Sequence, residues 1–62
     1  MKFVVEYRNL QGDWIHAGWE FKNQVSAMKC IIVESTIRHN RLCYRIEKIW
    51  KSGINRIVWE GR

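Results

Sequence analysis

The hydrophobic period of the chain changes at residues 23–40, which read NQVSAMKCIIVESTIRHN. Apolar side chains recur there at three- and four-residue spacing, which is the pattern of an amphipathic helix. Asn23 is suited to cap the first turn, because its side-chain carbonyl can accept a hydrogen bond from a free main-chain N–H group. Asn40 is suited to follow the last turn in a left-handed conformation. We therefore predict a helix over 24–39.

Apolar residues lie on more than one side of this predicted helix. The stripe expected to cover a sheet contains Val25, Met28, Ile31 and Ile32. A second group, on the opposite side, contains Cys30, Val33 and Ile37. A helix that covers a small sheet buries one stripe, so the second group must meet the sheet edge, a loop or another molecule. For the last case we predict a homodimer interface that includes Val33 and Ile37.

A β-hairpin is predicted before the helix. Apolar and polar residues alternate over 2–8 and again over 14–21, and both stretches are rich in β-branched and aromatic types. Such alternation is typical of a half-buried strand. The polar stretch 9–13 between them contains a glycine and suits a short hairpin loop.

A second hairpin is predicted after the helix. Alternation resumes over 41–51 but slips, and a β-bulge near Glu47-Lys48 would restore the pattern. Ser52-Gly53 is a turn signal, and a fourth strand is predicted over 54–60. Neither hairpin could bury its apolar face alone. The expected fold is thus α+β, a two-layer ββαββ domain over 1–62 with a four-stranded antiparallel sheet covered by one helix.

The length and composition limit the class of protein. A chain of 62 residues with 47% hydrophobic and 27% charged residues is typical of one small folded domain. No apolar run reaches the ~18–20 residues that a membrane span requires. The acidic Glu6 comes too early for the apolar region of a signal peptide. We therefore expect a cytoplasmic protein that does not bind membranes.

Two cysteines and two histidines are the potential metal ligands and disulfide partners. Cys30 and Cys43 do not have CxxC spacing, and in a reducing compartment we expect them to remain thiols. With His16 and His39 they make four potential ligands, which is the number that a zinc site needs. The close paired spacings of zinc modules are missing, however. No metal and no cofactor are therefore predicted.

Catalytic patterns are missing from the chain as well. The sequence has no GxSxG, HExxH or glycine-rich phosphate loop. Neighbouring carboxylates are at least seven positions apart, although Glu6 and Glu20 both lie on outward positions of the first hairpin and could form a pair. Solvated strand charges are the more usual role of such residues. We predict that the protein is not an enzyme.

Positive charge is concentrated in the second half of the chain. Residues 1–31 contain four basic and three acidic residues, whereas residues 32–62 contain seven basic and three acidic ones, and the net charge is +5. The predicted ligand-binding patch combines these basic residues with two tryptophans: Arg38, Arg41, Arg45, Lys48, Trp50, Lys51, Arg56 and Trp59. We expect them to converge at the helix end and along the second hairpin.

A basic and aromatic patch fits two kinds of partner. Bases stack on aromatic side chains while cations follow the phosphates, which predicts nucleic acid or a nucleotide as the ligand. Tryptophan and arginine are also the anchors of protein interfaces. The alternative is therefore a protein–protein inhibitor that docks on and blocks a host enzyme or defence factor.

The first hairpin also carries a resemblance. Lys2-Phe3-Val4-Val5-Glu6-Tyr7-Arg8, followed by a polar turn and Gly12-Asp13-Trp14, is similar to the opening of many short accessory proteins encoded by bacteriophages. Those proteins take over host machinery or blunt host defences. The resemblance implies a stoichiometric antagonist without a cofactor, acting in the host cytoplasm and able to form a homodimer. It transfers no site residue.

Overall fold

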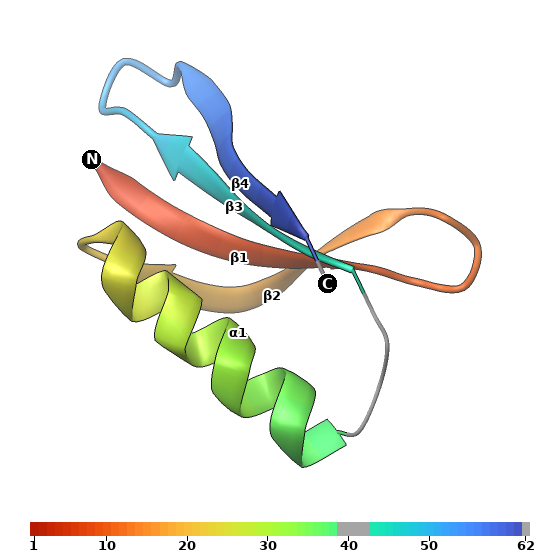
Figure 1. The fold of residues 1–62 in the computed structure, drawn as a ribbon. Coiled ribbons are helices and arrows are strands. Elements are labelled where there is room, and N and C mark those ends of the chain that lie inside the picture. The colour runs from red at the N-terminus through yellow and green to blue at the C-terminus, as the bar shows by residue number, and fades with distance from the viewer. Residues whose placement is uncertain (39–42, 62) are drawn as a thin grey trace.

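A computed structural model describes residues 1–38 and 43–61, apart from the side chains of Ala17 and Arg38. The elements, in chain order, are β1 (Lys2–Arg8), β2 (Trp14–Phe21), α1 (Gln24–Arg38), β3 (Tyr44–Ile49) and β4 (Asn55–Gly61). The strands form an antiparallel sheet in the order β2-β1-β3-β4, and α1 lies along one face of it (Figure 1). The predicted α+β class, with one helix against an antiparallel sheet, is confirmed.

The central position of β1 agrees with the burial of its consecutive apolar residues. Phe3, Val4 and Val5 are consecutive and all buried, so both faces of this strand are covered. A strand that is buried on both faces is best accommodated inside a sheet, between two partners. β1 accordingly pairs with β2 on one side and with β3 on the other. The helix connects β2 to β3 across this central strand.

The core lies between α1 and the face of the sheet that it covers. It is centred on Val5 and Ile46, which face each other across β1 and β3 and are fully buried. Ala27 and Ile31 meet them from the helix. The small side chain of Ala27 is also fully buried, which lets the helix backbone lie close to the sheet.

The helix begins where the sequence predicts. The Asn23 side chain accepts a hydrogen bond from the Ser26 main-chain N–H group (2.8 Å), which confirms the predicted N-cap. The helix is described to Arg38, one residue short of the predicted end; His39 and Asn40 lie outside the described residues.

The stripe that the helix turns to the sheet agrees with the prediction at Met28 and Ile31, but it also includes Cys30, which was expected on the opposite side. Ala27 and Ile31 are buried, and Met28 and Cys30 pack beside them. Val25 and Ile32, expected in the core, are more than half exposed. Apolar residues lie around most of the helix, so their spacing alone could not select the buried side. The close approach at Ala27 selects it.

The predicted bulge in the second hairpin occurs on the other strand. Ile46 pairs with Trp59 and Glu47 pairs with Ile57, so Val58 of β4 is the extra residue. The prediction near Glu47-Lys48 is therefore wrong in placing the insertion on β3. Both Val58 and Trp59 pack against the core, and an extra residue in β4 allows two consecutive side chains to do so.

The turn of the second hairpin is longer than predicted. The Trp50 main-chain N–H donates to the Ile54 carbonyl (2.9 Å), and the Gly53 N–H donates to the Trp50 carbonyl (3.0 Å). Gly53 has a φ of +87°, which glycine adopts without strain. β3 therefore ends at Ile49 rather than at Lys51, and β4 begins at Asn55 rather than at Ile54.

A second irregularity interrupts β2. Between the pairs Val4–Glu20 and Glu6–His16 the chain advances four residues along β2 but two along β1. Gly18, with φ +85°, lies in this insertion, and its N–H donates to Nδ1 of His16 (3.0 Å). Because the insertion is an even number of residues, the predicted alternation is kept at both ends of the strand.

Candidate functional site

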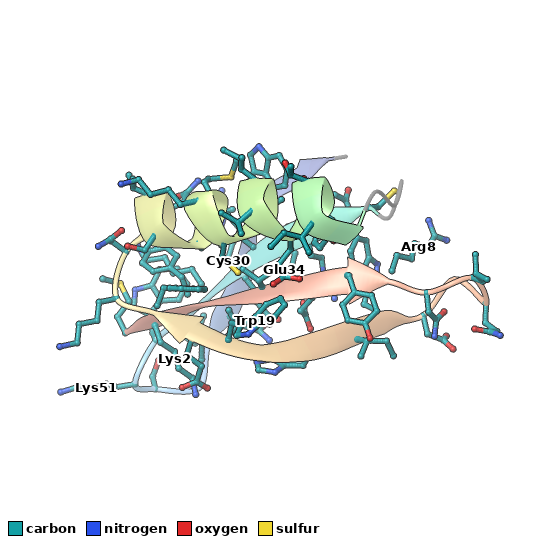
Figure 2. The ribbon with its side chains drawn as sticks, turned by 90° about the horizontal axis from the view of Figure 1, so that it is seen from below. Lys2, Arg8, Trp19, Cys30, Glu34 and Lys51 are labelled. Carbon is teal, nitrogen blue, oxygen red and sulfur yellow. The ribbon has the colours of Figure 1, made fainter. Side chains whose placement is uncertain are left out.

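Basic side chains from both hairpins meet at one end of the sheet. Lys2 begins β1 and pairs with Ile49, while Lys48 lies between Phe3 and Arg56 in the register of β1, β3 and β4. We call this group the basic end; its members are Lys2, Lys22, Lys48, Lys51 and Arg56. Figure 2 shows Lys2 and Lys51 at this end of the sheet and Arg8 at the opposite end.

Two members of the basic end come from segments that adjoin the strands. Lys22 directly follows β2, whose Phe21 pairs with Phe3, and Lys51 lies in the turn between β3 and β4. Lys2 is ion-paired with Glu20 (2.9 Å). Glu20 thus offsets one of the five positive charges, and hydrogen bonding and charge from Lys2 lower the pKa of its carboxyl group.

Trp50 is the aromatic residue of the basic end. Its indole ring is half-buried, and the Lys48 ammonium lies 4.8 Å from the ring centroid. The same ammonium lies 5.6 Å from the centroid of Phe3. Cation–π contacts of this kind hold a lysine against an aromatic face. They fix the orientation of Lys48 beside the indole.

A shallow hollow adjoins Trp50. Its volume is about 310 Å³, and it is lined by Met1, Lys2, Ile49, Trp50 and Lys51. Lys48 is absent from this lining. Trp50 thus contacts the Lys48 ammonium and also borders the hollow.

The predicted ligand-binding residues are divided between several places. Four of them gather at the basic end: Lys48, Trp50, Lys51 and Arg56. Arg45 and Trp59 lie elsewhere in the sheet. Arg38 ends α1, at the end of the sheet opposite to the β3–β4 turn (Figure 1), and Arg41 lies outside the described residues. The described residues thus do not form the continuous patch that was expected.

Arg45 and Lys48 are separated because the alternation of β3 is uninterrupted. Residues three positions apart in a strand point to opposite faces. A bulge at Glu47-Lys48 would have turned Lys48 to the side of Arg45, but the extra residue is Val58 of β4. Trp59 pairs with Ile46 and packs against the core on the helix side.

Arg45 belongs to a polar cluster on the sheet face that is opposite to the helix. Its Nε donates to Oε1 of Glu6 (2.8 Å), and its guanidinium lies 4.2 Å from the ring centroid of Trp14. The two paired side chains are 23% and 12% exposed, so this ion pair is largely shielded from water. We call Glu6, Trp14, Arg45 and Glu47 the Arg45 cluster.

Glu47 has a perturbed carboxyl group in this cluster. Burial raises its pKa, and hydrogen bonding and charge from Glu6 raise it further, while Asn55 and Arg45 act in the opposite direction. A carboxyl whose pKa is raised by folding favours the native state when it is protonated. Its contribution to stability therefore decreases as the pH rises through the raised pKa.

The carboxylate pair considered for catalysis is not formed. Glu6 pairs with His16 across the first hairpin and binds Arg45, whereas Glu20 pairs with Val4 and binds Lys2. Because of the insertion in β2, Glu20 lies four residues along the strand from His16, the partner of Glu6, instead of two. The carboxyl group that interacts with Glu6 is instead Glu47 of β3.

A second hollow, of about 260 Å³, lies at the other end of the sheet. Its lining contains the oppositely charged Arg8 and Glu60, together with Trp14, Cys43 and Gly61. The Arg8 Nε donates to the Gly12 carbonyl (3.2 Å), which engages its guanidinium in the β1–β2 loop. The charges of Arg8 and Glu60 offset one another, so this hollow has less preference for an anion than the basic end.

The outer side of α1 exposes aliphatic side chains. Four of them are more than half accessible: Val25, Ile32, Val33 and Ile37. We call these four residues the outer helix face. Val33 and Ile37 are exposed, as the predicted dimer interface requires, and Val25 and Ile32 extend the same surface.

The described residues also show how the chain stands against the requirements of a disulfide, a metal site and a membrane-spanning helix. Cys30 and Cys43 are free thiols. Burial raises the pKa of Cys30, and the charge of Glu34 raises it further. Residues 1–38 and 43–61 contain no group of three or more histidine, cysteine or acidic side chains placed to bind a metal ion. Within the same ranges, no helix has the length and hydropathy needed to cross a bilayer.

Comparisons with known proteins identify no relative. No family model, curated protein or solved structure matches this chain. The functional argument therefore depends on the residues described above.

Proposed function

We propose that this protein is a small non-catalytic module that binds nucleic acid through its basic end. It would act stoichiometrically, as an antagonist of the kind that short bacteriophage accessory proteins provide. The observation that supports the proposal is that five basic residues lie at one end of the sheet, where the Lys48 ammonium contacts the half-buried indole of Trp50. Neither a cofactor nor a catalytic group has a part in it.

The charge and the aromatic ring together favour nucleic acid over other acidic partners. Nucleic acid has a regular array of phosphates, and basic side chains that neutralise them release bound counterions. Trp50 adds a surface on which a base can stack. The members of the basic end come from both hairpins, so the whole sheet holds them in place.

We expect measurable binding to oligonucleotides at low salt and a steep loss of affinity as salt increases. Each neutralised phosphate of a single strand contributes a slope of about 0.7 to the plot of log K against log salt concentration. Fluorescence anisotropy with labelled single-stranded oligonucleotides of 20 nucleotides measures this slope. Lys51→Glu should weaken binding at least roughly tenfold, because one attraction is replaced by a repulsion at the site.

Lys29→Glu is the matched control. Lys29 is also an exposed lysine, but it lies within α1 and does not belong to the basic end. Its reversal changes the net charge by the same amount and should weaken binding far less. Equal losses in the two variants would show that overall charge is responsible, and a wild-type protein that binds no DNA or RNA at low salt would refute the proposal.

The outer helix face favours a second candidate function, binding of a protein partner. Aliphatic patches on a surface helix commonly mark interaction sites. We propose that this face binds a second copy of the chain, with Val33 and Ile37 in the interface. A partner enzyme or defence factor of the host is the other possibility for this face. Pull-downs from bacterial lysate with and without nuclease distinguish a polypeptide partner from a polynucleotide.

Self-association through the outer helix face predicts a particle of twice 7.5 kDa. Light scattering at increasing protein concentration should detect it, and Val33→Lys should restore the monomer. Ile57→Lys is the matched control, because Ile57 is an exposed isoleucine on the other side of the sheet. A monomeric wild type at every concentration would rule out the homodimer.

A further inference from the structure

Trp50 adjoins both a cation and a hollow. The Lys48 ammonium lies 4.8 Å from the ring centroid. The hollow of about 310 Å³ is lined by Trp50 but not by Lys48. A cation thus lies over the indole, and the same residue borders a hollow that a ligand could enter.

We infer that this hollow is a subsite for one unpaired nucleobase, stacked on Trp50. The inference rests on the proposed function and specifies its ligand: a single strand, or a nucleotide, rather than a duplex. The residues that line the hollow are of two kinds. Met1, Ile49 and Trp50 offer apolar surface to a planar base. Lys51 offers an ammonium group to its phosphate, and Lys2, which is paired with Glu20, lies beside it.

The Trp50 indole is already ordered before any ligand binds. The Trp50 main-chain N–H donates to the Ile54 carbonyl, and the Trp50 carbonyl accepts from the Gly53 N–H. Both main-chain polar groups of this residue are therefore hydrogen-bonded within the turn. Lys48 holds one ring face through its cation–π contact. A stacking platform that is already ordered loses little side-chain freedom on binding, and this increases affinity.

The geometry distinguishes single strands from duplexes. In a duplex each base is already stacked on its neighbours and paired, and it must be unstacked before it can reach an aromatic ring in a hollow. The phosphates of both forms can still contact the lysines. We therefore expect the basic side chains to bind either form, and Trp50 to supply the preference for unpaired bases.

The test uses four probes of defined chemistry: a thymidine strand (single-stranded DNA of 20 thymidine nucleotides), an abasic strand of equal length, a 20-base-pair duplex and thymidine monophosphate. Wild-type protein should bind the thymidine strand more tightly than the abasic strand or the duplex. Trp50→Ala should weaken binding of the thymidine strand roughly 5- to 150-fold, the range expected for one stacked base. Its affinity for the abasic strand and for the duplex should be unchanged.

Two further variants keep the test decisive. Trp50→Phe retains an aromatic ring in the same turn and should keep part of the preference, even if Trp50→Ala folds poorly by circular dichroism. Lys51→Ala should weaken binding of all three polymers. Thymidine monophosphate competes with the thymidine strand if the hollow accepts a free nucleotide, and it fails to compete if the neighbouring phosphates of a strand are required.

Separate results would overturn the subsite and the proposed function. Equal losses on the thymidine and abasic strands in Trp50→Ala, or an unchanged affinity for the thymidine strand in both Trp50 variants, would overturn the stacking subsite while nucleic-acid binding remained. Failure of the wild type to bind any of the polymers at low salt would overturn the proposed function itself.

Discussion

Replacement of Arg45 with alanine should destabilise the protein by about 2–4 kcal/mol at neutral pH, somewhat less than the ~3–5 kcal/mol for one partner of a buried ion pair, because both side chains keep some exposure. The variant loses the 2.8 Å contact with Glu6 and the contact with the Trp14 ring. Glu6 and Glu47 then lie close together without their common cation. Urea denaturation followed by circular dichroism measures the loss. It is a large fraction of the roughly 3–9 kcal/mol expected for a domain of this size.

The pH dependence of this loss identifies its cause. The pKa of Glu47 is already raised by burial and by Glu6, and removal of Arg45 should raise it further. Protonation of Glu47 relieves the repulsion, so the difference between variant and wild type should shrink as the pH falls from 7 to 5. A difference that stays constant over that range would show that the paired carboxylates are not responsible.

Glu47→Gln is the companion variant for this experiment. It removes one of the two charges, so the Arg45→Ala/Glu47→Gln protein should recover part of the lost stability. Lys51→Ala controls for the change in net charge, because Lys51 is exposed in the β3–β4 turn. An exposed substitution of this kind changes stability by about 0.5 kcal/mol or less.

Ile46→Ala should produce the other large effect. Ile46 is fully buried, with Val5 and Trp59 as its neighbours on the adjoining strands. Truncation of a buried isoleucine removes apolar contact and leaves a cavity, and the cost is about 2–5 kcal/mol. For this small domain we expect a much larger unfolded population at room temperature, measured by urea denaturation and by the dispersion of amide resonances.

Two comparisons test whether packing explains the effect of Ile46→Ala. Ile46→Val removes one methyl group and should cost about 0.5–1.5 kcal/mol. Ile57→Ala truncates an exposed isoleucine of the neighbouring strand and should cost less than Ile46→Ala. If Ile57→Ala were as harmful as Ile46→Ala, the core would not be centred between α1 and the central strands.

Residue spacing predicted the local elements of this protein well. The strands at 2–8 and 14–21 and the helix start at Gln24 agree with the structure. These features depend on neighbours within a few positions: alternation along a strand, and a cap that contacts a main-chain group three residues away. The ends of β3 and β4 were predicted less well, because the turn between them depends on hydrogen bonds at Trp50 and Gly53.

The candidate site was predicted only in part. Lys48, Trp50, Lys51 and Arg56 were named from the charge and aromatic pattern of the second hairpin. Lys2 and Lys22 were missed because the first half of the chain has almost balanced charge. The hairpin pairing of 2–8 with 14–21 could have placed those two lysines beside each other. Their proximity to Lys48 depends on the pairing of β1 with β3.

The amino-acid sequence by itself determined where strands and helix form and where the chain carries its positive charge, because these properties depend on neighbouring residues. Only the tertiary structure decided that β1 is central, that Ala27 faces the sheet and that Val58 is the bulged residue. Those choices depend on contacts between residues far apart in the chain. The position of the bulge has the largest consequence, since it leaves Arg45 and Lys48 on opposite faces of β3.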